Sequence, residues 1–162
     1  MLDFKKVEQL LEREGAKWIA DIQANMIAEG ANASGNTSAS LETRATRTPD
    51  GLNFQVIGDE AFNWIETGRG PTRGSGNGDV LPRIRKWIDD KGLVDDEGDL
   101  DALAYKIANT IHNYGTLLYR LGERRDIYTP VFSDSEIDRV TKLIEDLSAD
   151  EIESTFIKAW SK

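Results

Sequence analysis

The sequence contains a single histidine, His112, the side chain that most often transfers protons in enzymes near neutral pH. It has no second histidine and no cysteine, whereas zinc sites usually combine three or four nitrogen, sulfur or carboxylate ligands. We therefore expect no catalytic centre, no cofactor and no bound metal. An enzymatic function would instead predict an activity that disappears on His112→Ala or Glu66→Ala.

Glycines and arginines alternate with small polar residues from Gly68 to Gly78, a composition that suggests phosphate binding. The loop lacks the Gly-Lys-Ser/Thr ending that places an ammonium and a hydroxyl group on the phosphates and Mg²⁺. It also does not lie between a parallel strand and a long helix, as a dinucleotide-binding loop does. Ser75 is not part of a Gly-x-Ser-x-Gly nucleophile motif. We expect a connector, or an arm that contacts a neighbour.

Carboxylates crowd the segment 95–101, which suggests a calcium-binding loop. Placing Gly98 at the sixth position of such a loop puts Leu93 where the first acidic ligand must lie, so this register fails. We expect a solvated loop in which Asp99 caps the helix that follows.

The formal net charge is −9, from 20 Lys and Arg against 29 Asp and Glu, the opposite of the balance in most free DNA-binding proteins. Between residues 69 and 86 five residues are basic and one is acidic, whereas between 133 and 153 eight are acidic and two are basic. This polarity predicts either two unlike contact surfaces or two solvated faces. No signal-peptide pattern and no membrane-spanning apolar run is visible, so we expect a soluble cytoplasmic product.

Hydrophobic periodicity and turn residues predict an α+β fold, in which a small antiparallel hairpin packs on long N-terminal and central helices. Apolar residues spaced three and four apart predict a helix from Asp3 to Ala28, which contains the helix-weakening Gly15. A Pro-Asp-Gly turn predicts a hairpin with strands 38–48 and 52–57. Further helices are expected over 60–65 after the cap Asp59, over 83–90 with Pro82 in the first turn, over 99–121, over 134–147 and, after Ser148, at the C-terminus.

Two parts are expected in the chain. Residues 1–132 form the α+β domain, and residues 133–162 form an acidic helical extension packed on the same domain or on a neighbour. The first strand of the hairpin is mostly polar, so one face of the sheet is expected to be solvated or covered by another subunit.

The segment Phe62–Pro71 gives the most specific indication of function. Trp64 and Ile65 are expected to anchor a short helix on the core, and Gly68 to release the chain outward. Glu66 lies at the end of that helix, where its charge opposes the helix dipole and needs a compensating cation.

The predicted cation is Arg69 or Arg73. Aromatic anchors beside a glycine-rich, arginine-bearing arm are typical of contacts between subunits. The predicted interface residues are Trp64, Glu66, Gly68, Arg69, Pro71 and Arg73.

Residues 10–132 resemble the neck and tail-completion proteins of tailed bacteriophages, the family typified by the lambdoid minor tail component. The likeness lies in a long N-terminal helix, a hairpin and an aromatic-x-x-Glu-x-Gly-Thr/Arg-x-x-Pro segment, here Phe62–Pro71, with Thr67-Gly68 where Gly-Thr is more usual. A helix and an extended tail carrying a proline follow. Versions from phages of Bacteroidetes-type hosts are especially similar at 103–108, Gly115-Thr116, Tyr119-Arg120 and 126–128.

The resemblance implies a structural virion protein without catalytic residues, which forms a ring at the head–tail junction around the DNA channel. Its partners would be copies of itself, six or twelve to a ring, together with the portal or adaptor ring and the tail proteins. It would be assembled in the host cytoplasm and would reside in the neck or tail of the virion.

An alternative is a nucleic-acid-binding phage accessory protein that uses the basic segment 69–86 with Trp87 interleaved. Within a ring, the same segment would touch passing DNA only transiently. The candidate DNA-channel contacts are Arg73, Arg83, Arg85 and Lys86.

Overall fold

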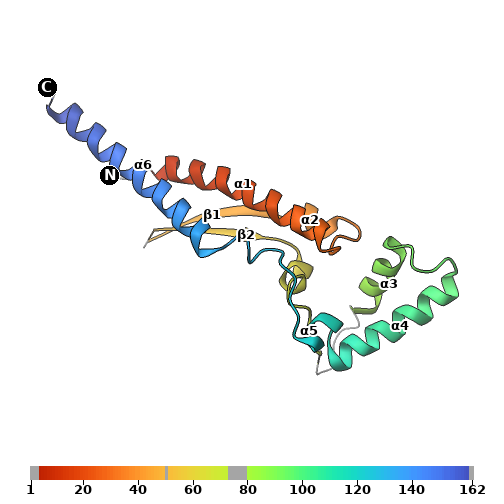
Figure 1. Cartoon of the computed structure of the whole chain (residues 1–162). Helices are drawn as coiled ribbons and strands as arrows, with labels where there is room; N and C mark the ends of the chain where they lie inside the picture. The colour runs from red at the N-terminus through yellow and green to blue at the C-terminus, as the bar shows by residue number, and fades with distance from the viewer. Residues whose placement is uncertain (1–3, 50, 73–79, 161–162) are drawn as a thin grey trace. The chain divides into compact units, whose positions relative to one another are not determined.

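A computed structural model describes residues 4–49, 51–72 and 80–160 of the 162-residue chain. The two strands pair antiparallel, with Ala45 opposite Phe54, and the predicted α+β class is confirmed. Figure 1 shows the elements, which are α1 (Phe4–Ala28), α2 (Asn36–Ala39), β1 (Glu42–Thr48), β2 (Gly51–Ile57), the 3-10 helix η1 (Glu60–Trp64), α3 (Val80–Asp90), α4 (Glu97–Tyr114), α5 (Leu117–Leu121) and α6 (Asp134–Trp160).

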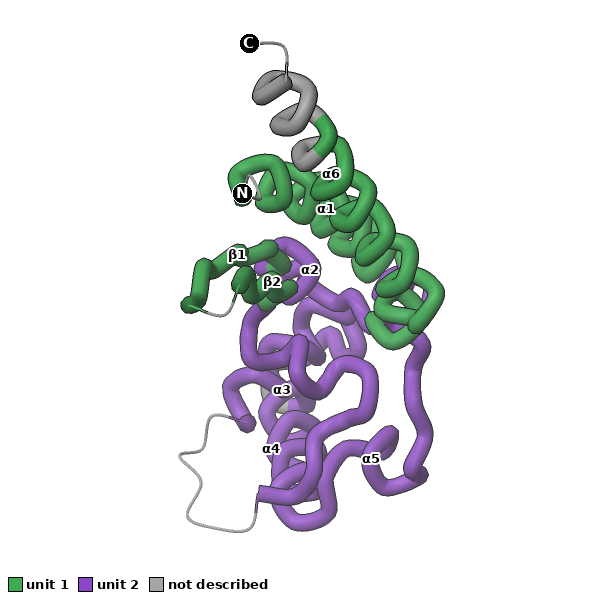
Figure 2. The backbone as a smooth tube through the Cα atoms, turned by 90° about the vertical axis from the view of Figure 1, so that its left-hand side faces the viewer, with its two compact units in different colours: residues 1–24, 41–57, 128–162 green, residues 25–40, 58–127 purple. Residues whose placement is uncertain are grey.

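The chain folds into two compact units, each made of segments that are distant in the sequence (Figure 2). Unit 1 contains residues 1–24, 41–57 and 128–162, which include most of α1, the hairpin and α6. Unit 2 contains residues 25–40 and 58–127, which include the end of α1 and the elements α2 to α5. The predicted boundary after residue 132 does not coincide with these units, and it stays a prediction.

The core of unit 1 lies between α1, the hairpin and α6. Trp18 of α1 contacts Phe54 of β2 and Phe132, with ring centroids 5.9 and 5.4 Å apart. Val140 of α6 is buried on the same side. The predicted apolar stripe of the first helix therefore does form the core, with Val7, Leu10, Leu11, Trp18 and Ile22 all buried.

Gly15 lies in the middle of α1, which continues through it as one helix. A Cβ atom at this position would lie 2.5 Å from Thr43 Cγ2 and 2.6 Å from Phe54 Cζ. The glycine therefore allows the hairpin to approach the helix closely, and this contact explains a residue that is otherwise unfavourable in a helix.

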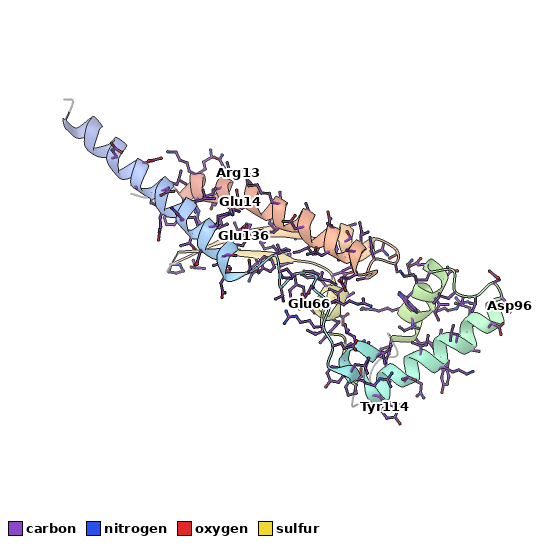
Figure 3. All side chains as sticks on the ribbon, viewed as in Figure 1. Arg13, Glu14, Glu66, Asp96, Tyr114 and Glu136 are labelled. Atoms are coloured by element: carbon purple, nitrogen blue, oxygen red, sulfur yellow. The ribbon has the colours of Figure 1, made fainter. Side chains whose placement is uncertain are left out.

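A charge network also joins α1 to α6 in unit 1 (Figure 3). The Glu14 carboxylate is buried and accepts hydrogen bonds from Arg139 (2.6 Å) and Lys17 (2.9 Å), which lower its pKa to about 2. Glu136 accepts from Arg139 (2.8 Å) and from the Trp18 indole (2.8 Å), and these bonds lower its pKa to about 2 as well. Buried polar groups are thus satisfied along the helix contact.

Unit 2 is built around the pair α3 and α4. Ile88 of α3 packs against Leu100 and Ala104 of α4, and Ile84 and Ile107 extend this cluster. Pro82 lies in the first turn of α3, as predicted.

The helix predicted from 99 to 121 is in fact two helices, because the chain turns at Gly115. This glycine has a φ of +83°, a conformation that ends a helix, and the side chain of Thr116 then caps α5 by accepting from the amide of Tyr119. The start was also wrong by two residues. α4 begins at Glu97. At its N-terminal end the capping carboxylate is that of Asp96 rather than Asp99, and it accepts a hydrogen bond from the Asp99 amide.

Two further predictions of secondary structure were wrong. Residues 36–39 form the helical turn α2, so the first strand begins at Glu42 rather than at residue 38. The C-terminal region is one continuous helix, α6, and does not break at Ser148. The Ser148 hydroxyl instead donates to the carbonyl of Ile144 (2.6 Å), which satisfies a polar side chain inside a helix.

Candidate interaction surface

Asp59 caps the short helix η1, as predicted. Its carboxylate accepts hydrogen bonds from the Phe62 amide (3.2 Å) and from the Thr37 hydroxyl (3.0 Å), and its own amide donates to Ser40 Oγ (2.9 Å). These bonds hold η1 to α2 and to the turn after it. The beginning of the Phe62–Pro71 segment is thus fixed within unit 2.

Glu66 is completely buried, and its carboxylate forms an ion pair with Arg124. The Glu66 carbonyl also accepts a hydrogen bond from the Arg125 amide (2.9 Å). Arg124 approaches Glu66 from the chain that follows α5, whereas the predicted cation was Arg69 or Arg73; Arg73 lies outside the described residues. Since the carboxylate is enclosed in its own unit, it is a structural group here rather than a surface contact.

The arm base, which we define as residues 68–72, is packed against the turn between α4 and α5. The Arg69 amide donates to Thr116 Oγ1 (3.0 Å), and its carbonyl accepts from the Thr116 amide (2.9 Å). Further along, the Thr72 amide donates to the carbonyl of His112 (3.0 Å). The arm base is therefore held by several backbone bonds, and the predicted release of the chain at Gly68 was wrong.

Three glycines make this close packing feasible. A Cβ atom on Gly68, whose φ is +75°, would collide with Thr116 Oγ1 and lie 2.7 Å from the Tyr119 amide nitrogen. A Cβ atom on Gly115 would lie 2.8 Å from the Arg69 carbonyl oxygen, and one on Gly70 would lie 3.2 Å from the Tyr119 ring. The glycines of this segment thus serve packing. Arg73, Ser75 and the rest of the loop to Gly78 lie outside the described residues.

Trp64 was predicted to anchor η1 in the core. The structure contradicts this prediction, because 43% of the Trp64 surface is exposed. It lies at the rim of two hollows in unit 2, together with Trp87 of α3, which is 40% exposed. Half-exposed tryptophans are frequent where a surface is later covered by a partner. The prediction that Trp64 contacts another subunit remains open.

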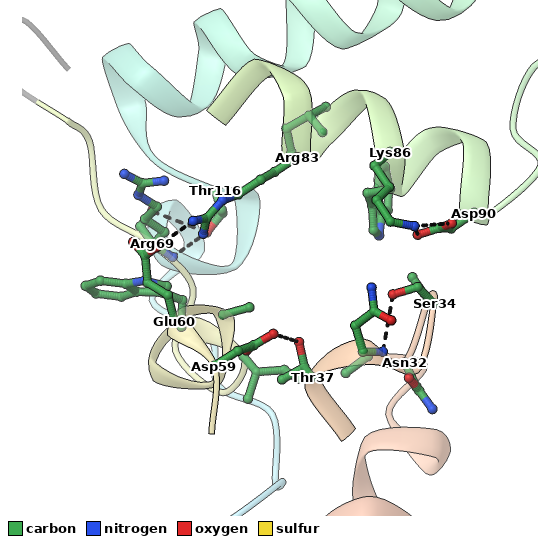
Figure 4. A pocket seen from close by; sticks show the side chains of 18 of the residues that line it. Asn32, Ser34, Thr37, Asp59, Glu60, Arg69, Arg83, Lys86, Asp90 and Thr116 are labelled. Atoms are coloured by element: carbon green, nitrogen blue, oxygen red, sulfur yellow. Dashed lines mark hydrogen bonds and ion pairs between the residues drawn. The ribbon is translucent and has the colours of Figure 1, made fainter. Parts of the chain in front are cut away.

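The first hollow, of about 550 Å³, is lined by Arg69, Arg83 and Lys86 of the basic segment (Figure 4). Two of the cations that line it are paired with carboxylates. Arg83 pairs with Glu60 (2.8 Å) and Lys86 with Asp90 (2.8 Å), while Arg85 nearby pairs with Asp101 (2.5 Å). The local charge is therefore nearly balanced. Because each of these cations has a carboxylate beside it, the local attraction for DNA phosphates is weak.

The second hollow is an apolar groove of about 560 Å³ between η1, α3, α4 and α5, which we call the α4–α5 groove. Ile84, Ile107 and Ile111 line it, and Leu117, 61% exposed, stands at its edge. The periodicity of the sequence predicted Ile107 and Ile111 as part of the apolar stripe of one long helix. Because the chain turns at Gly115, the last part of the predicted helix forms α5 instead, and the groove stays open.

Most large exposed apolar side chains among the described residues belong to unit 2. Tyrosines predominate near the groove, and Tyr114 lies at the end of α4 (Figure 3). Such a concentration is typical of protein–protein contact surfaces. The exposed residues around α4 and α5 are Tyr105, Tyr114, Leu117, Tyr119 and Leu121.

Within the described ranges, no group of three or more histidine, cysteine or acidic side chains is arranged to hold a metal ion. No helix there is long and apolar enough to cross a membrane. His112 is half-buried, and its carbonyl supports the arm base. The features that the sequence did not reveal are the ion pair of Arg124 with Glu66, the packing of Tyr119 against the arm base, and the groove. The sequence does contain a signal for the break between α4 and α5, which is Gly115-Thr116. Glycine often ends a helix, and threonine often caps the helix that follows.

No family model matches the chain, and no curated protein or solved structure is significantly similar to it.

Proposed function

We propose that the chain is a structural subunit of a tailed bacteriophage, which forms a ring of six or twelve copies at the head–tail junction. The observation that carries this proposal is that most of the large apolar side chains exposed among the described residues belong to unit 2. One of these side chains, Tyr119, packs against Gly70 of the arm base, in the segment on which the resemblance to neck and tail-completion proteins rests. The expected partners are copies of the chain, the portal or adaptor ring above and the tail proteins below.

The balance of charge suits a position beside passing DNA. With a net charge of −9 and with Arg83, Arg85 and Lys86 each paired to a carboxylate, the subunit would attract phosphates only weakly. A channel that DNA must cross needs this property, because tight phosphate binding would stop the DNA.

Nucleic-acid binding as the main function is the competing interpretation. It draws on the half-exposed Trp87 beside Lys86, since aromatic side chains stack on bases. A salt titration separates the two functions, because phosphate-driven affinity falls steeply with salt. Tight binding of duplex DNA by the purified chain at physiological salt would contradict the structural function.

The direct test is a reconstruction of the tailed particle that carries this chain. We expect a ring of copies at the neck, in which the exposed side chains of unit 2 contact a neighbouring subunit. We also expect the purified chain to be monomeric or weakly associated, and to form rings only against its partner ring.

A further inference from the structure

The α4–α5 groove combines an apolar floor with a basic rim. Ile107 and Ile111 lie on its floor, whereas Lys106, Arg120 and Arg125 line its edges. Among the residues that the structure places around it, none is acidic. An occupant must therefore bring apolar side chains for the floor and carboxylates for the rim.

The three rim cations differ from several other basic residues of unit 2. Arg83, Lys86 and Arg124 each pair with a carboxylate of the same unit. The structure gives Lys106, Arg120 and Arg125 no ion pair with any described residue, although the chain has a surplus of nine negative charges. In an acidic protein, such a cluster of uncompensated cations favours an acidic partner.

The chain itself contains a segment with these properties, the end of α6. This helix passes α1 in the opposite direction, since Arg139 pairs with Glu14 and Asp150 lies beside Lys6 in a shallow hollow. α1 begins only two residues before Lys6, whereas α6 continues for ten residues after Asp150. At a rise of about 1.5 Å per residue, roughly 15 Å of helix extends beyond the part that α1 can cover.

The sequence of this extension matches the groove. Glu151 and Glu153 are acidic, and Ile152, Phe156 and Trp160 recur every four residues, the spacing of an apolar stripe on a helix. Amphipathic helices bind apolar grooves through anchors at this spacing.

We propose that the end of α6 in one copy of the chain binds the α4–α5 groove of a second copy. The donated helix and the accepting groove are different surfaces, so the contact is head-to-tail, and repetition of such a contact closes into a ring when the rotation allows. The inference rests on the self-association in the proposed function and names the surfaces that carry it.

The test is a titration of a fluorescent peptide of residues 146–160 with the full-length chain, followed by anisotropy. We expect saturable binding that weakens with salt, and that weakens about tenfold or more when Lys106→Glu and Arg120→Glu are combined. The pair Arg44→Glu and Lys142→Glu reverses two exposed cations of unit 1 and should leave the affinity unchanged, which controls for net charge.

The apolar part of the contact has its own matched pair of variants. Leu117→Ser changes an exposed edge of the groove, while Leu93→Ser changes a similarly exposed leucine (51%) elsewhere in unit 2. We expect only Leu117→Ser to weaken binding, by about fivefold or more. Because both side chains are exposed, neither variant should unfold the chain.

Absence of saturable binding up to about 1 mM peptide would overturn the inference, as would binding that the groove variants leave unchanged. Either result leaves the proposed function standing, because a ring can form through another surface. Conversely, a chain that lies outside the neck of the particle would overturn the proposed function even if the peptide binds the groove.

Discussion

Glu66 shows why the partner of a buried charge is difficult to predict from the sequence. Its carboxylate is completely buried and therefore needs a cation, and Arg124 supplies one from a distant part of the chain. Nothing in local spacing links these two positions, because the pair depends on how the chain returns after α5. Long-range ion pairs of this kind cannot be deduced from periodicity.

The ion pair predicts a double-mutant cycle. Arg124→Ala leaves a buried carboxylate without its cation, so we expect the free energy of unfolding to fall by about 3 kcal/mol. Combining it with Glu66→Gln removes the charge and should recover a large part of that loss. Urea unfolding measures the free energy of unfolding of the single and the double variant. A stability of Arg124→Ala within about 0.5 kcal/mol of the wild type would show that the pair is not needed.

Gly68 provides a second test at the residue scale. Gly68→Ala adds a Cβ atom that collides with Thr116 Oγ1 and imposes an unfavourable positive φ, so we expect a loss of about 2–4 kcal/mol. Gly92→Ala is the matched control, because its φ is +59° and nothing lies within 4 Å of the added atom. This control should cost only about 1 kcal/mol. Equal losses in the two variants would contradict the close packing of the arm base.

At the scale of elements, repeated apolar spacing predicted the long helices well. α1 lies where the stripe of Val7, Trp18 and Ile22 placed it. The hairpin also followed from its turn residues, although its first strand starts later. The interruption at Gly115 was missed because Leu118 and Leu121 continue the same spacing after the turn. That break opens the groove, so the element boundary that the sequence did not reveal is also the one on which the proposed contact depends.

The contact between α1 and α6 predicts acid sensitivity of unit 1. Hydrogen bonds from Arg139 lower the pKa of Glu14 and of Glu136 from 4.5 to about 2. Carboxylates with a lowered pKa add stability that is fully present above about pH 4.5 and is lost as the pH falls toward 2. We therefore expect the unfolding midpoint in urea to decrease steadily across this range.

The Glu14→Gln variant should show a flatter dependence on pH, because one of the two coupled carboxylates is gone. Glu12→Gln changes an exposed glutamate of the same helix and should follow the wild-type curve. A wild-type midpoint that stays constant between pH 5 and pH 3 would be inconsistent with the network.

At the scale of the whole molecule, the balance of charge predicts weak contact with DNA. We expect the purified chain to bind duplex DNA with a dissociation constant above about 100 µM at physiological salt. Combining Arg83→Glu with Lys86→Glu should reduce residual binding, whereas Arg44→Glu with Lys142→Glu should have a smaller effect. Fluorescence anisotropy at several salt concentrations measures this. Binding tighter than about 1 µM would favour the nucleic-acid-binding function instead.

The central claim is that the chain forms a ring at the head–tail junction, and a reconstruction of the intact tailed particle tests it most directly. We predict density for six or twelve copies at the neck, surrounding the DNA channel, with the exposed apolar side chains of unit 2 covered by neighbouring subunits. A particle in which the chain is absent, or in which it lies away from the neck, would contradict the claim.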